Sequence, residues 1–230
     1  VNGCPGDIQS RGRPARRQGR FPSPAPFFLS YNLFRDSVSL FLAQNAVLAA
    51  IVVLMAFTPI GYLKLGAVEM TFIMIPVAVG AITLGEKSGA FLGLVFGVSS
   101  FIQCFGMSPF GAALLQINPI FTFIMCLVPR VLMGYLCGVI YKFLAKVKKG
   151  LAVVIASFSA PVLNTLFFIS SLMIFFGKSD FIMGMRSGTE NLMAFLIAFV
   201  GFNGVMEIVT TTLIAPPVAL AVEKAVKKFK

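Results

Sequence analysis

The sequence predicts an all-α polytopic membrane protein, with six transmembrane helices in one compact bundle and both termini in the cytoplasm. Its residues are 58% hydrophobic and only 12% charged, whereas a soluble domain carries about a quarter charged residues. Asp, Glu, Lys and Arg are absent from the stretches 37–63, 88–129 and 150–177. A helix that crosses the bilayer core needs about 20 apolar residues, so each stretch can hold at least one crossing.

The first 32 residues differ from the rest of the chain. Residues 1–32 are rich in Gly, Pro, Arg and Ser and show no apolar period. Such a segment buries too little apolar surface to fold by itself. We therefore expect a disordered basic tail over 1–32 and one membrane-embedded domain over 33–230.

Six apolar segments are predicted to cross the membrane. The second is short and contains Pro76, the fourth is interrupted at Pro129, and the sixth carries Glu207. The predicted spans are 37–57, 70–84, 88–105, 119–144, 151–176 and 191–222.

The distribution of Lys and Arg predicts the orientation, because cytoplasmic loops of membrane proteins are enriched in these residues. Basic residues of the tail, of the 142–149 loop and of the C-terminal end fall on one side. The other side holds only Lys64, Lys178 and Arg186. Long loops on one face of a scaffold often carry function, so we expect the outward loops to form a lid over a pocket. These loops are 58–69, 106–118 and 177–190.

Several other classes of function are disfavoured by composition. The chain has no His, and its Cys residues form no CxxC pair, so we expect no disulfide framework, no Cys/His metal site and no cofactor. The net charge of +11 lies in the tail and short loops, which does not indicate a nucleic-acid partner. Without His, an acid pair or a metal cluster, an intramembrane enzyme is disfavoured.

The segment 80–88 resembles a phosphate-binding P-loop, yet it departs from the pattern. Glu86 stands between the second Gly and the Lys, and the segment joins two apolar helices instead of a strand and a helix. If ATP drives this protein, another subunit must hydrolyse it.

Small residues recur every four positions in three predicted spans, the first, the third and, at Gly134 and Gly138, the fourth. Such stripes let helix backbones approach closely in lipid. They either pack within the chain or dock onto a partner helix, and the pair Ala46 and Ala50 is the best docking candidate. The third span carries Gly85, Gly89, Gly93 and Gly97, of which Gly89 and Gly93 are further docking candidates.

Polar residues inside the spans form the candidate site. Arg130, Asn164 and Asn203 each lie about twelve residues, or roughly 18 Å, below the outer end of their span. Glu207 lies one turn deeper, on the face of Asn203. A charge at the bilayer centre costs at least about 2.5–3.5 kcal/mol, so we expect Arg130 and Glu207 to face the interior and to pair. We call these four residues the polar layer. It is either a buried ion pair that fixes helix packing or the floor of an outward-facing pocket.

Other polar residues lie nearer the predicted outer surface. They can capture an anionic solute, or they can be ordinary helix caps and solvated loop charges. These residues are Gln116, Asn118, Asn191, Lys178 and Arg186.

The chain from residue 65 to its end resembles the substrate-binding (S) components of energy-coupling factor (ECF) vitamin transporters. The resemblance lies in EMTFIMIPVAVGAITLGEKSGAFLGLVFGVSSFIQ at 69–103, VPRVLMG at 128–134, PVLNTLFF at 161–168 and GFNGVME at 201–207. It is greatest for the pantothenate branch of that family.

This resemblance implies a six-helix bundle in the bacterial cell membrane that binds a water-soluble vitamin from outside, most similar to a pantothenate carrier. The bundle would dock on a transmembrane coupling subunit with two ATPases, and toppling of the bundle would release the vitamin inside. An S component for riboflavin, niacin or cobalamin remains an alternative. A stand-alone secondary carrier is another, although no inverted repeat is evident.

Overall fold

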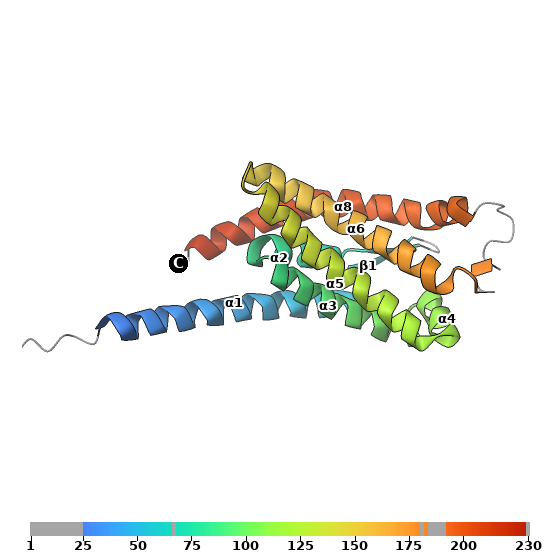
Figure 1. Cartoon of the computed structure of the whole chain (residues 1–230), viewed down its shortest axis with the longest axis horizontal. Helices are drawn as coiled ribbons and strands as arrows, with labels where there is room; N and C mark the ends of the chain where they lie inside the picture. Colours follow the sequence, from blue (N-terminus) through green and yellow to red (C-terminus); the bar gives the residue numbers. More distant parts are fainter. Residues whose placement is uncertain (1–24, 66–67, 180–181, 184–191, 229–230) are drawn as a thin grey trace, which may run out of the picture. The chain divides into compact units, whose positions relative to one another are not determined.

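The computed structural model describes residues 25–65, 68–179, 182–183 and 192–228. Its contacts divide the chain into two compact units, Val1–Ser39 and Leu40–Lys230, and the packing below is that of the second unit. The elements shown in Figure 1 are α1 (Ala25–Phe57), η1 (Pro59–Gly61), β1 (Tyr62–Leu65), β2 (Val68–Thr71), α2 (Met74–Leu84), α3 (Glu86–Gln103), α4 (Pro109–Ile117), α5 (Pro119–Leu144), α6 (Lys149–Phe176) and α8 (Leu192–Lys228).

The prediction of a multi-pass membrane protein is confirmed, but with fewer spans among the described residues than the sequence suggested. Helix α2 has 11 residues, so it covers about 16 Å of a bilayer core that is about 30 Å thick. Helix α3 is not among the helices that are both long enough and apolar enough to cross a membrane. Four candidate spans remain in the described part of the chain: Val38–Phe57, Pro119–Leu144, Lys149–Phe176 and Gly204–Ala225.

In the described part of the chain the fold is helical, as predicted, apart from one short hairpin. Strands β1 and β2 pair antiparallel, with Tyr62 opposite Thr71, inside the segment expected to be an outward loop. The predicted second span, 70–84, therefore begins as a strand, and its helix starts only at Met74. Alternating apolar and polar residues over 62–65 and 68–71 favour strands over a helix.

Two helix starts depend on side-chain caps. Helix α4 lies within a second predicted loop, with Pro109 in its first turn and Ser108 Oγ accepting from the Gly111 N–H at 3.3 Å. Helix α5 begins where Asn118 Oδ1 accepts from the N–H groups of Ile120 and Phe121, at 3.0 and 3.1 Å. Such caps satisfy backbone donors that have no partner within the helix. Helix α1 begins at Ala25, ahead of the predicted start at residue 37.

Helices α3 and α5 pack along the glycine stripe. A Cβ on Gly89 would lie 2.2 Å from the carbonyl oxygen of Gly134, and one on Gly93 would lie 2.2 Å from the carbonyl oxygen of Arg130. Side chains at either position would separate the two backbones. The stripe therefore packs within the chain, which corrects the assignment of Gly89 and Gly93 as docking residues for a partner.

The main hydrophobic core surrounds α2. Nearly every residue of this short helix is buried, and it contacts α3, α5, α6 and α8. A smaller apolar cluster joins α4, α5 and α6 beside the N-terminal end of α5 (Figure 1). Its members are Leu114, Met125, Leu172, Phe176 and Ile182. Helix α4 is thus anchored to the bundle through its own apolar contacts.

Ion pairs join the opposite end of the bundle. Lys142 of α5 lies 2.7 Å from Glu86 at the start of α3, and Lys149 pairs with Glu223 near the end of α8. The pairs are partly solvent-exposed, so water and salt screen the attraction between their charges. They lie at the end that the Lys and Arg distribution predicts to be cytoplasmic.

Candidate functional site

Arg130 is held by groups from three helices. Its guanidinium carbon lies 5.5 Å from the centre of the Phe96 ring on α3 and 5.2 Å from that of Phe168 on α6. Its Nη1 donates to the carbonyl oxygen of Met125 at 3.0 Å, so the side chain turns back toward the N-terminal end of α5. Its Nε is buried and has no hydrogen-bond partner. The site therefore presents a fixed cation with an unused donor.

Asn164 provides an unused acceptor on α6, the helix that carries Phe168. It is only 8% exposed, and its Oδ1 has no hydrogen-bond partner. Residues four apart on a helix share a face, so Asn164 lies one turn from Phe168, the residue that flanks Arg130. Burying an amide oxygen without a partner costs about 1–3 kcal/mol. A ligand donor that reaches Asn164 would offset this cost.

Glu207 has a different partner from the one expected. It is 5% exposed, and its Oε1 accepts from the backbone N–H of Thr71 at 3.1 Å. Glu207 and Arg130 are both described, and no ion pair joins them. The predicted pairing is therefore wrong for this structure, because Arg130 turns toward Met125 and the two rings while Glu207 holds the end of the hairpin.

The predicted common level of Asn164 on α6 and Asn203 on α8 agrees with the packing of these two helices. A Cβ on Gly204 would lie 3.4 Å from Thr165 Oγ1. Gly204 follows Asn203, and Thr165 follows Asn164, so the two helices meet at the level of the predicted layer. The side chain of Asn203 lies outside the described residues, and Arg186 and Asn191 lie there entirely.

The surface candidates are not brought together with the layer. Asn118 caps α5 through its Oδ1, which supports its interpretation as a helix cap. Gln116 is exposed on α4, and Lys178 is exposed after α6. None of these three forms a hydrogen bond with Arg130 or Asn164 in the described part of the structure.

Sequence reasoning missed the two aromatic residues and the backbone donor at this site. Phe96 and Phe168 lie among many apolar residues, and only the spacing of Phe168 from Asn164 gives a signal. Thr71 was assigned to a helical span, so its N–H was expected to bond within a helix. Only the strand exposes that donor to Glu207.

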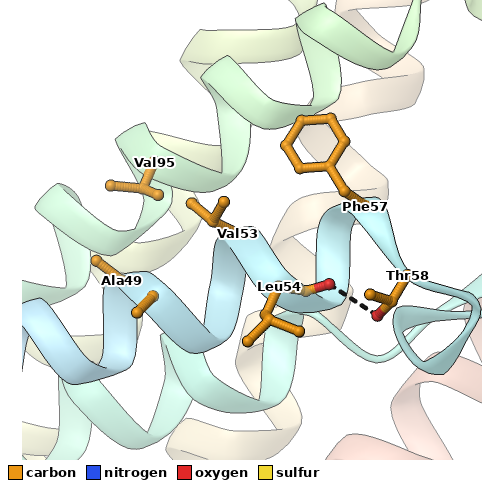
Figure 2. A pocket seen from close by; sticks show the side chains of 7 residues that line it. Ala49, Val53, Leu54, Phe57, Thr58 and Val95 are labelled. Carbon is orange, nitrogen blue, oxygen red and sulfur yellow. Dashed lines mark hydrogen bonds between the residues drawn. The ribbon is translucent and has the colours of Figure 1, made fainter.

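The first helix carries an exposed apolar groove of about 640 Å³. Figure 2 shows Ala49 and Val53 of α1 facing Val95 of α3, and the Thr58 hydroxyl donates to the Leu54 carbonyl oxygen at 2.7 Å. Ala46 and Ala50 are both exposed, unlike Gly89 and Gly93. The groove is lined by Ala49, Ala50, Val53, Leu54, Phe57, Thr58 and Val95.

Comparison with known proteins adds a family assignment to this geometry. Residues 40–219 match the family model described as "ECF transporter, substrate-specific component". The chain is 30% identical over 169 residues to the pantothenic acid transporter PanT of Lactococcus lactis subsp. cremoris, covering 67% of this chain and 80% of that protein. It is 32% identical over 172 residues to the pantothenate transporter PanT of Leuconostoc mesenteroides subsp. mesenteroides, covering 70% and 81%.

The family and both relatives are transport proteins rather than enzymes. The family match covers the described helices from within α1 to within α8 and so includes the whole polar layer. Together with the candidate membrane spans, these similarities lead to one conclusion: the chain belongs to the family of substrate-specific components of ECF transporters, and it is a multi-pass protein of the bacterial cell membrane.

Proposed function

We propose that this chain is the substrate-binding membrane subunit of an ECF-type importer that captures pantothenate from outside the cell. The similarity to two proteins named as pantothenate transporters supports this substrate. The observation that carries the proposal is the buried, unpartnered Oδ1 of Asn164, one helical turn from the residue that flanks the Arg130 guanidinium. A site with one free acceptor and one free cationic donor suits a ligand with both an anionic and a hydroxyl end.

Pantothenate has these groups: a carboxylate, an amide and hydroxyls. In the proposed complex the carboxylate accepts from Arg130, because hydrogen bonds between charged partners are the strong ones. A hydroxyl or the amide N–H donates to Asn164 Oδ1. We also assign Glu207 and Asn203 of α8 to the binding of the ligand. We assign Gln116, Asn118 and Arg186 to its capture from outside, and the position of Arg186 lies outside the described residues.

The proposed pocket opens outward beneath the two elements that the sequence left as loops. The β1–β2 hairpin and α4 form the lid, and contact between Glu207 and Thr71 anchors the hairpin to α8. In this topology two more segments cross the membrane in addition to the four candidate spans. One is β2 together with α2, and the other is α3. The six crossings leave both termini in the cytoplasm. The basic residues at the Lys142–Glu86 end support that orientation.

Delivery inward is proposed to need a transmembrane coupling subunit and two ATPases. Ala46 and Ala50 lie on the exposed face of α1, beside the groove of Figure 2. Small residues on a lipid-facing helix allow a partner helix to approach closely. We assign this face to the coupling subunit and propose that the loaded bundle topples against it to release the vitamin.

The test is calorimetry on the purified chain in nanodiscs, with pantothenate, its uncharged alcohol analogue, riboflavin, niacin and cobalamin as ligands. We expect pantothenate to bind, and the alcohol analogue to bind more weakly because it lacks the carboxylate for Arg130. Binding of another vitamin instead of pantothenate would show that the other vitamin is the substrate. Ion-driven uptake by the chain alone in vesicles, without ATPases, would favour a secondary carrier.

A further inference from the structure

Two cysteines meet where the end of α3 packs on α5. The Sγ atoms of Cys104 and Cys126 lie 3.9 Å apart, although the residues are 22 positions apart in the chain. Both side chains are buried, with 5% and 4% exposed. We propose that Cys104 and Cys126 are a disulfide-forming pair, which on oxidation ties the predicted outer end of α3 to α5.

The packing of the two helices explains why the thiols meet. Gly97 has no side chain, and a Cβ there would lie 2.9 Å from the Cα of Leu127, the residue after Cys126. The close approach of these backbones leaves the two thiols in contact. An S–S bond is about 2.05 Å long, so oxidation requires the sulfur atoms to approach by about 2 Å, a distance within the reach of side-chain rotation.

A reagent can reach this pair through the end of α3. Cys104 is followed by Phe105, which is 69% exposed, and by Gly106, which has a φ of +130°. Helix α4 covers the thiol, since a Cβ on Gly111 would lie 2.6 Å from Cys104 Sγ. Displacement of α4 from its apolar contacts with α5 and α6 would uncover Cys104.

Cys137 provides an internal control. It is fully buried in α5, and its thiol donates to the carbonyl oxygen of Ala156 at 3.3 Å. All three cysteines are free thiols, but among the described residues no second thiol is hydrogen-bonded to Cys137. The proposal thus predicts different reactivity for three buried cysteines in one chain.

The oxidant is a low-molecular-weight disulfide. One protein thiolate attacks a sulfur of the reagent, which forms a mixed disulfide and releases one reagent thiolate. The second protein thiolate attacks the protein sulfur of that mixed disulfide and displaces the second reagent thiolate. In sum, two protein thiols are oxidised to one disulfide and one reagent disulfide is reduced to two thiols.

The experiment uses the full chain with Cys4→Ser, in nanodiscs, treated in parallel with glutathione disulfide and with the apolar dipyridyl disulfide. The readouts are intact mass and alkylation of remaining thiols after unfolding. We expect loss of two hydrogen masses, protection of Cys104 and Cys126, and continued alkylation of Cys137. Single variants Cys104→Ser and Cys126→Ser should not lose these masses.

Two results would overturn the proposal. One is full alkylation of both cysteines, or only mixed disulfides, after treatment with both reagents. The other is a lower melting temperature for the oxidised protein than for the reduced protein. A disulfide in native geometry restricts the unfolded chain and raises the melting temperature, so a decrease would mean that the bond forms only in a distorted fold.

Discussion

Replacing Asn164 by Leu separates binding from stability at the polar layer. In the free protein the buried Oδ1 of Asn164 has no partner, and such a group costs about 1–3 kcal/mol. Leu has a similar volume and no polar atom, so the free energy of unfolding should not decrease. The ligand would lose a buried hydrogen bond of about 1–3 kcal/mol, which lowers affinity roughly 5- to 150-fold. Asn164→Ala should weaken binding to a similar extent.

The assay combines calorimetry with pantothenate and thermal unfolding of the ligand-free protein. Asn45→Leu is the matched control, because Asn45 is also buried, at 7% exposed, and also has an unpartnered Oδ1. It lies on α1, which supplies none of the described contacts of Arg130 or Asn164. The control should bind pantothenate with unchanged affinity. Unchanged affinity in Asn164→Leu together with a lower melting temperature would make the layer purely structural and refute the reasoning.

Three further predictions test the glycine stripe between α3 and α5, the aromatic contacts of Arg130, and the docking face of α1. Gly93→Leu should lower the free energy of unfolding by about 1–3 kcal/mol or more through overpacking against α5. The control Gly150→Ala, with no atom within 4 Å of the added Cβ, should change it by less than about 0.5 kcal/mol. Chemical denaturation measures both, and equal effects would contradict the packing of α3 on α5 through the glycine stripe. Phe168→Leu should reduce pantothenate affinity about 2- to 5-fold by removing a cation–π contact of about 0.5–1 kcal/mol. Phe168→Tyr keeps an aromatic ring and should retain the affinity. Calorimetry that finds tighter binding in Phe168→Leu than in Phe168→Tyr would exclude this role. Changing Ala46 and Ala50 together to Trp should abolish vitamin uptake by cells but preserve binding to the isolated subunit, and loss of binding would remove the docking assignment.

The membrane class and the position of the polar layer could be predicted because both depend on local properties. Hydropathy and the absence of charge identify lipid-exposed segments without knowledge of their neighbours. The constant rise of a helix converts residue number into depth, and the contact of Gly204 with Thr165 agrees with the depth worked out for Asn164. The boundaries of α5 were also predictable, because Asn118 and Pro119 mark its start.

The secondary structure of the predicted outer loops could not be obtained in this way. Strand β2 begins in a predicted outer loop and ends in the predicted second span, and Thr71 at its end bonds to Glu207, which is 136 residues away. Helix α4 is nine residues long, and isolated helices this short are marginal in water. Its stability depends on apolar contacts with α5 and α6, which no local pattern specifies.

The sequence by itself determined that the chain lies in the membrane, which segments are apolar, and which polar residues lie within those segments. Tertiary structure alone decided the partners: Gly93 packs against α5 within the chain, and Arg130 lies between Phe96 and Phe168. Glu207 holds the hairpin instead of pairing with Arg130. The physical reason is that burial follows from the composition of one segment, whereas a side chain's partner depends on the relative rotation and spacing of helices that are distant in sequence.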